Sequence, residues 1–198
     1  MYEAKKYDSI RELDGISEKT MTEHYKLYEG YVKKANEIEE KLKTVDRSTA
    51  NQIYSDLRAL KLEYSFAVGG IKNHEFYFWH LGGKGGEPKG ALAEQIVKDF
   101  GSFAAFKEDM KQTGLAARGW VWLAIDWNTG KLFNYLGDAQ NSYPIWNATP
   151  FVALDTYEHA YWLDTGSARA TYIENFFKNL NWEVIEKYYD DATGMMKQ

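Results

Sequence analysis

The stretch Trp120-Val121-Trp122-Leu123-Ala124-Ile125-Asp126 decides the fold class of this chain. Its residues are almost all β-branched, aromatic or aliphatic, which is typical of a buried strand. The turn sequence Asn128-Thr129-Gly130 follows, and residues 131–136 return as an antiparallel partner strand. Further on, Phe151-Val152-Ala153-Leu154 after Pro150 predicts a short buried strand. The second half of the chain is therefore expected to contain a three-stranded antiparallel sheet.

Upstream of this sheet, apolar residues recur at steps of three and four, the period of amphipathic helices. One series covers residues 21–45, with Ser17 as its expected N-cap, and a second covers residues 53–67. The polar segment Asp46-Arg47-Ser48-Thr49 separates them. Two helices joined in this way are expected to form an antiparallel hairpin.

Glycine pairs mark the remaining boundaries of the N-terminal half. Gly69-Gly70 is expected to interrupt the second helix before a further helical series that contains His74, and the glycine-rich segment 82–88 must be a loop. The domain boundary is placed there. It gives a helical-hairpin domain over residues 1–84 and a second domain over residues 85–198.

Further helices are expected on both sides of the sheet in the sequence. Two precede it, over residues 90–99 and 102–117, the second with Ser102 as its N-cap. Two more follow it, starting at about Ala168 and at about Asn181. The predicted fold class is α+β, with an N-terminal antiparallel helical hairpin and a C-terminal domain of helices and a three-stranded antiparallel sheet.

The composition excludes several classes of protein. An apolar fraction of 44% with 27% charged residues is typical of an ordered globular protein. Because the chain has no cysteine, only imidazole and carboxylate groups can hold a metal. The net charge of −5, with lysines interspersed among acids, argues against nucleic acid as a partner. Neither a membrane-spanning run nor the apolar core of a signal peptide occurs, so we expect a cytoplasmic protein without a membrane partner.

The chain has only four histidines, and three of them have suggestive positions. His24 and His74 fall on the apolar stripes of predicted helices, where polar groups need partners. His159 follows Asp155, which ends the last predicted strand, by four residues. His80 is expected to be a loop histidine. Taken singly, a histidine is more often a hydrogen-bonded core residue or a surface residue than a metal ligand.

The segment Asp155-Thr156-Tyr157-Glu158-His159-Ala160-Tyr161-Trp162 resembles the signature of the iron/manganese superoxide dismutases. Residues 69–74 are similar to the stretch with the second metal ligand of that family, and residues 85–90 to the loop after it. Three further matches cover the approach to the first ligand, the first strand and the last helix: residues 16–24, 119–123 and 181–183. The resemblance thus extends over most of the chain.

This resemblance implies an enzyme that converts superoxide to dioxygen and hydrogen peroxide by redox cycling of one bound manganese or iron ion. The implied ligands are His24, His74, Asp155 and His159. Zinc does not suit the reaction, because it has no second accessible oxidation state. The alternative is a non-catalytic or weakly active metal-binding homologue that acts in interaction or metal storage.

Five other residues complete the implied site. Gln140 resembles the glutamine that manganese members supply from the sheet region, and Tyr31 the gateway tyrosine that bonds it. Trp120 resembles a tryptophan that walls the metal pocket, and Tyr157 stands where the family usually has another tryptophan. Glu158 resembles the acid that reaches the ligand histidine of a partner subunit. For Gln140 the alternative is an ordinary turn residue, and for Tyr31 and Trp120 it is core packing.

The resemblance also bears on the metal and on the oligomer. Iron members usually carry their glutamine where this sequence has Gly70, so manganese is favoured over iron. A homodimer is implied, because Glu158 and His159 match the family pair that bridges subunits. Trp162 stands where the family usually has a tyrosine, and we expect it to pack against Tyr28 across the interface.

The first helix allows one geometric prediction. His24 and Tyr31 are seven residues apart, which is within about 20° of two full helical turns. The family usually has one residue more in this interval. A regular α-helix therefore places both side chains on one face, and we expect Tyr31, and not Tyr28, to lie nearest Gln140.

Overall fold

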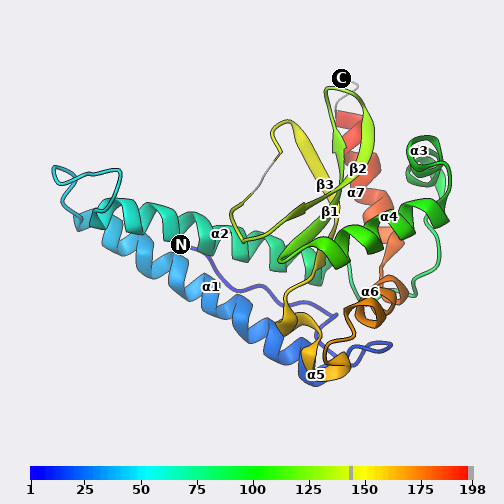
Figure 1. Ribbon diagram of the computed structural model, residues 1–198, viewed down its shortest axis with the longest axis horizontal. Coiled ribbons are helices and arrows are strands. Elements are labelled where there is room, and N and C mark those ends of the chain that lie inside the picture. Colours follow the sequence, from blue (N-terminus) through cyan, green and yellow to red (C-terminus); the bar gives the residue numbers. More distant parts are fainter. Residues whose placement is uncertain (143–144, 196–198) are drawn as a thin grey trace.

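The computed structural model describes residues 1–142 and 145–195, and it has the predicted α+β architecture (Figure 1). The elements in chain order are α1 (Glu18–Thr44), α2 (Asp56–Trp79), α3 (Gly90–Phe100), α4 (Phe103–Ala116), β1 (Trp120–Asp126), β2 (Lys131–Gly137), β3 (Ala148–Asp155), the 3-10 turn η1 (Glu158–Ala160), α5 (Trp162–Thr165), α6 (Arg169–Lys178) and α7 (Trp182–Met195). The sequence predicted all of these elements except η1 and α5.

The helices α1 and α2 form the predicted antiparallel hairpin, whose tip extends away from the rest of the molecule (Figure 1). Each helix begins at a serine N-cap. The Ser17 side chain accepts a hydrogen bond from the Thr20 backbone N–H, and the Ser55 side chain accepts one from that of Arg58. Ile53 was expected in the second helix, but it lies before the cap and is 85% exposed.

The expected interruption at Gly69-Gly70 is wrong, because α2 continues through both glycines to Trp79. A glycine in a helix interior costs only about 1 kcal/mol relative to alanine. Burial offsets this cost, since Ala67, Gly70, Ile71 and His74 are all buried. Tertiary packing thus overrides the local preference, and His74 sits on one unbroken helix.

The sheet has the strand order β2-β1-β3, with both pairs antiparallel. The central strand β1 is buried from Trp120 to Ile125. The strand β3 is longer than predicted, because it begins at Ala148 and includes Pro150. Proline lacks a backbone N–H but is tolerated here, since β3 is an edge strand and the register shifts between Leu123 and Ala124.

His80 was expected in a loop, but it is buried at the C-cap of α2. Its Nε2 accepts a hydrogen bond of 2.9 Å from the Ala153 N–H of β3, and its carbonyl accepts one of 2.8 Å from the Asn181 N–H. Sequence periodicity missed this role because both partners are far away in the sequence. The histidine therefore holds the end of α2 against the last strand.

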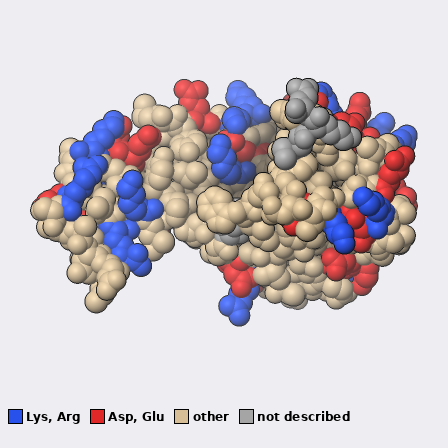
Figure 2. Space-filling view, turned by 90° about the horizontal axis from the view of Figure 1, so that it is seen from above, with Lys and Arg blue, Asp and Glu red and all other residues tan. Residues whose placement is uncertain are grey.

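The helices of the second half cover the sheet and fill the space beside it (Figure 1). Ser102 is the predicted N-cap of α4, where its side chain accepts a hydrogen bond from the Ala105 N–H. On the face drawn in Figure 2, positive and negative side chains are interspersed around large uncharged areas. Among the described residues, no helix is both long enough and apolar enough to cross a membrane.

Candidate metal centre

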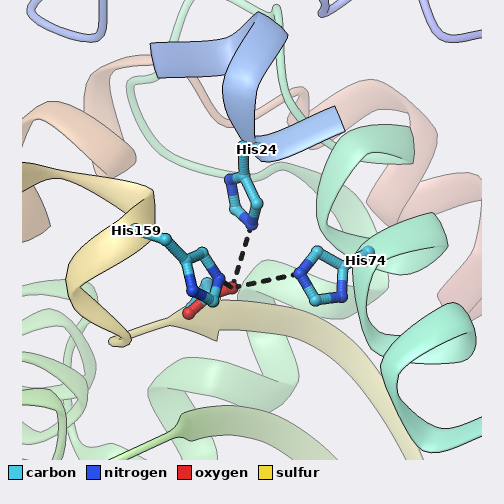
Figure 3. Close-up of side chains that lie close together, drawn as sticks. His24, His74 and His159 are labelled. Carbon is cyan, nitrogen blue, oxygen red and sulfur yellow. Dashed lines mark hydrogen bonds and ion pairs between the residues drawn. The ribbon is translucent and has the colours of Figure 1, made fainter. Parts of the chain in front are cut away.

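Four side chains from four elements meet where the hairpin contacts the sheet. His24 comes from α1, His74 from α2, Asp155 from the end of β3 and His159 from η1. Their nearest ligand atoms all lie within 4.8 Å of one another, and three of the four residues are completely buried. Figure 3 shows the three imidazoles pointing toward one another from their separate elements. A buried set of this kind fits a metal ion.

Asp155 is at the centre of this cluster, with its two carboxylate oxygens in different roles. Its Oδ2 lies 3.1 Å from His24 Nε2, 3.2 Å from His159 Nε2 and 3.8 Å from His74 Nε2. Its Oδ1 accepts a hydrogen bond of 2.8 Å from the Tyr157 N–H. The backbone therefore anchors one oxygen and leaves the other facing the three imidazoles.

The hydrogen bond of His74 indicates what its other ring nitrogen does. His74 Nδ1 lies 2.6 Å from the Gly70 carbonyl, which can only accept, so this nitrogen carries the proton. Nε2 is then left with a lone pair, and it is buried without a hydrogen-bond partner. A backbone acceptor that fixes the tautomer in this way is typical of metal-binding histidines. The residues present thus fit a bound cation.

Burial and mutual contact set the charges of the cluster. Burial lowers the pKa of His24, and it lowers the pKa of His74 to about 3, so both imidazoles are neutral. Burial alone would raise the pKa of Asp155, but contacts with His159 and His24 outweigh it and hold that pKa well below its usual range. Burial lowers the pKa of His159, but the Asp155 carboxylate outweighs this effect, so the net direction is upward. The site therefore offers two neutral imidazoles and a carboxylate, the protonation states that a metal requires.

Gln140 lies beside the cluster and connects three side chains. Its Oε1 accepts hydrogen bonds of 3.1 Å from Trp120 Nε1 and of 3.4 Å from Asn73 Nδ2. Its Nε2 donates to the Tyr31 hydroxyl at 3.5 Å. Asn73 was not singled out from the sequence, although its position directly before His74 was a usable signal.

Comparisons with known proteins identify the family. The family model of the alpha-hairpin domain of iron/manganese superoxide dismutases matches residues 7–82, and that of their C-terminal domain matches residues 88–188. The chain belongs to the iron/manganese superoxide dismutase family. An iron or manganese cofactor accordingly fits the buried cluster.

Named iron and manganese superoxide dismutases are both similar to this chain over nearly their whole length. The iron superoxide dismutase of Aquifex pyrophilus is 42% identical over 96% of this chain and 92% of its own. That of Aquifex aeolicus is 43% identical over 91% and 87%, respectively. A manganese superoxide dismutase of Haloferax volcanii is 33% identical over 96% and 94%. The relatives therefore include both metals and do not decide between them.

The other residues predicted from the superoxide dismutase resemblance differ in how close they lie to the cluster. The Trp120 ring is 5.3 Å from the His74 ring, and the Tyr157 ring stacks on His159 at 5.3 Å. Tyr31 lies 5.3 Å from His74, and α1 is regular through residues 24–31, as expected. Glu158 is exposed, and no hydrogen bond joins it to His159 within the described part of the chain.

The expected packing of Tyr28 against Trp162 across a superoxide dismutase dimer is wrong. Tyr28 is completely buried inside its own chain, where its hydroxyl accepts a hydrogen bond from the Lys5 N–H and donates one to Glu75. Trp162 is 51% exposed. Leu27, the residue before Tyr28, faces outward from α1 and is 43% exposed. One residue is 100° of helix rotation, which separates the two faces.

Proposed function

We propose that this protein is a superoxide dismutase and that His24, His74, Asp155 and His159 hold its manganese or iron ion. The observation that carries the proposal is the convergence of three imidazole nitrogens on one buried carboxylate oxygen. When bound, the ion supplies the change between divalent and trivalent states that oxidation of one superoxide and reduction of another require. Burial keeps His24 and His74 neutral, and contacts with the imidazoles keep Asp155 anionic.

Tyr31 and Gln140 are the groups of this chain that can manage a proton beside the site. Burial and the nearby Asp155 carboxylate raise the pKa of Tyr31, while its hydrogen bond with Gln140 lowers it, and the net direction is upward. The hydroxyl therefore stays protonated at neutral pH. Since reduction of superoxide to hydrogen peroxide consumes protons, we assign Tyr31 the role of proton donor and Gln140 that of orienting it.

Trp120 and Tyr157 are proposed to wall the site. Trp120 is completely buried against His74 and holds Gln140 through its indole N–H. Tyr157 covers His159, the least buried of the four cluster residues. Rings in these positions exclude water and limit access to a small substrate.

Manganese is the proposed metal. The support is the position of the buried amide, because Gln140 approaches from the sheet side of the site and Gly70 offers no side chain from α2. Hydrogen bonds beside a metal centre tune its chemistry, so the placement of a single amide matters. Reconstitution with each metal tests the proposal, with higher activity and resistance to peroxide inactivation expected for the manganese form.

A homodimer and a cytoplasmic, antioxidant role complete the proposal. Leu27, Trp162 and Leu163 are large exposed apolar residues on α1 and α5, two elements that contact each other. Glu158 lies on the neighbouring turn with its carboxylate exposed, available to a partner subunit's ligand histidine. Cell fractionation tests the location, and Glu158→Ala is expected to weaken both the dimer and metal retention.

Alanine substitution tests the proposed function most directly. His74→Ala and Asp155→Ala are each expected to remove bound metal and dismutase activity together, because water replaces an inner ligand poorly. The matched control is His80→Gln, which changes a buried histidine outside the cluster and keeps an acceptor for the Ala153 N–H. Full metal occupancy in Asp155→Ala contradicts the ligand assignment. Full occupancy without activity in the unaltered protein indicates a metal-storage homologue.

A further inference from the structure

Gly70 lies in the interior of α2, directly beneath the ring of Tyr31 on α1. A Cβ placed on Gly70 would lie 2.7 Å from Tyr31 Cγ, 2.8 Å from Cδ1 and 2.9 Å from Cδ2. Ordinary contacts of a Cβ begin at 3.4 Å. Because all three atoms belong to one rigid ring, no side-chain rotation at its far end relieves the overlap. A side chain at position 70 and the ring in its present position exclude each other.

The backbone of Gly70 does not explain why a glycine stands there. The residue is helical, and its φ angle is not positive. Alanine is the better helix former, so α2 by itself would favour a side chain at this position. The neighbouring Tyr31 ring is the feature of the structure that leaves no space for a Cβ at this position.

Tyr31 is half-buried and has two aromatic neighbours. Its ring has the rings of Phe66, at 6.1 Å, and His74, at 5.3 Å, as neighbours. To bring the nearest carbon from 2.7 Å to an ordinary contact of 3.4 Å, the ring would have to move by roughly 0.7 Å. The hydrogen bond from Gln140 to the Tyr31 hydroxyl is already 3.5 Å long, at the limit for such a bond. A movement of this size therefore changes a contact that has no slack in its length.

We propose that Gly70 is a positioning residue. Because Gly70 has no side chain, the Tyr31 ring can lie close to α2, in the place where the Tyr31 hydroxyl accepts a hydrogen bond from Gln140. The inference rests on the proposed function, because it assigns Tyr31 a role in the reaction. Gly70 then has two effects. Its carbonyl orients His74, and the absence of a Cβ leaves space for the Tyr31 ring.

A double-mutant cycle on the metal-loaded protein tests the contact without reference to activity. Gly70→Ala is expected to lower the urea midpoint when Tyr31 is present and to raise it in the Tyr31→Ala background, where only the helix preference for alanine remains. Tyr31→Val serves as a second background in case Tyr31→Ala does not fold. If Gly70→Ala does not fold on its own but folds in the Tyr31→Ala or Tyr31→Val background, the result also supports the contact. Equal effects in all backgrounds overturn the proposal.

Gly30→Ala is the matched control. Gly30 precedes Tyr31 in α1, and a Cβ placed there meets nothing within 4 Å. This variant introduces the same atom into a helix next to the same tyrosine without a clash. It is expected to keep the urea midpoint or raise it, in both the Tyr31 and the Tyr31→Ala backgrounds.

A second set of measurements tests positioning in the reaction. Gly70→Ala is expected to retain its metal and to lose about 10- to 100-fold in turnover. In the Tyr31→Phe background, which lacks the hydroxyl, the same substitution should cause no further loss. A full additional loss there shows that Gly70 does not act through Tyr31. Absence of dismutase activity in every variant, including the unaltered protein, refutes the proposed function while the stability cycle still decides the contact.

Discussion

At the scale of single residues, the site depends on hydrogen bonds that fix tautomers and orientations. The Gly70 carbonyl fixes which nitrogen of His74 carries the proton, and the Tyr157 N–H fixes which oxygen of Asp155 faces the cluster. Both partners belong to the backbone. They therefore persist through most substitutions, while the side-chain contacts of Gln140 do not.

Gln140→Ala is expected to retain the metal and to slow turnover by about 10- to 100-fold, because it removes hydrogen bonds beside the centre and no ligand. It removes both the acceptor for Trp120 Nε1 and the donor to the Tyr31 hydroxyl. Metal analysis and a pulse-radiolysis assay on the same sample measure the two effects. Asn141→Ala, at the neighbouring residue that bonds Ser65, is the control and should change neither. Loss of metal from Gln140→Ala would assign it a ligand-holding role.

At the scale of elements, the junction of α2 with β3 brings two cluster residues together. His74 is in the last two turns of α2, and Asp155 ends β3. His80, at the end of α2, joins this helix to β3 because its Nε2 accepts a hydrogen bond from the Ala153 N–H. This bond requires a neutral Nε2, since a protonated imidazole has no acceptor.

His80 is expected to make the fold sensitive to acid. Burial lowers its pKa to about 3 in the folded chain, against about 6.5 in an unfolded one, so the unfolded state binds more protons between these values. Stability is then complete above pH 6.5 and falls as the pH drops below it. From pH 6.5 to 4.5 the loss from this residue is roughly 2 kcal/mol.

His80→Gln places a non-titrating acceptor near the same position and is expected to remove this part of the acid sensitivity. The measurement is the difference in unfolding free energy between the variant and the unaltered protein from pH 7 to 4.5, at equal metal saturation. Acid effects on the metal ligands are shared by the two proteins and cancel in the difference. A difference that does not change with pH would show that His80 takes up protons equally in the folded and the unfolded state.

At the scale of the whole molecule, the cluster takes two residues from the helical hairpin and two from the half that contains the sheet. The predicted domain boundary between residues 84 and 85 stays a prediction. A bound ion necessarily links the two halves. Binding to the folded state alone also stabilises it, by about 4 kcal/mol when free metal is a thousandfold above its dissociation constant.

Removal of the metal by a chelator is therefore expected to lower the melting temperature of the unaltered protein. The same treatment of Asp155→Ala should have no effect, because that variant has no metal to lose. Differential scanning calorimetry before and after chelation, with readdition of manganese, measures both. A chelator effect of equal size in the two proteins would place the stabilising ion elsewhere.

The exposed apolar residues of α1 and α5 predict where the subunits meet. Trp162→Glu is expected to shift the proposed dimer toward monomer at micromolar concentration, because it places a charge in an apolar contact. Trp146→Glu is the matched control, since Trp146 is 85% exposed on the connection between β2 and β3. Sedimentation velocity distinguishes the two. Equal dissociation, or none, in both variants contradicts this interface.

Local signals in the sequence were enough to predict several elements of the fold. Helical periodicity, serine caps and the alternation of strand and turn residues predicted α1, α4 and β1 nearly to the residue, because each signal lies within a few residues of the element that it defines. The signature around Asp155 and the positions of His24 and His74 indicated the site in the same way. The other features depend on contacts between segments that are distant in the chain.

The continuity of α2 through Gly69-Gly70, the burial of His80 and of Tyr28, and the contact of Gly70 with Tyr31 all depend on which segments pack together. These segments are tens of residues apart in the chain. Periodicity reports which side of a helix is apolar, but it does not report which atom of a distant segment comes to lie against it. That is determined by close packing of the assembled core, where a single Cβ decides whether two side chains fit.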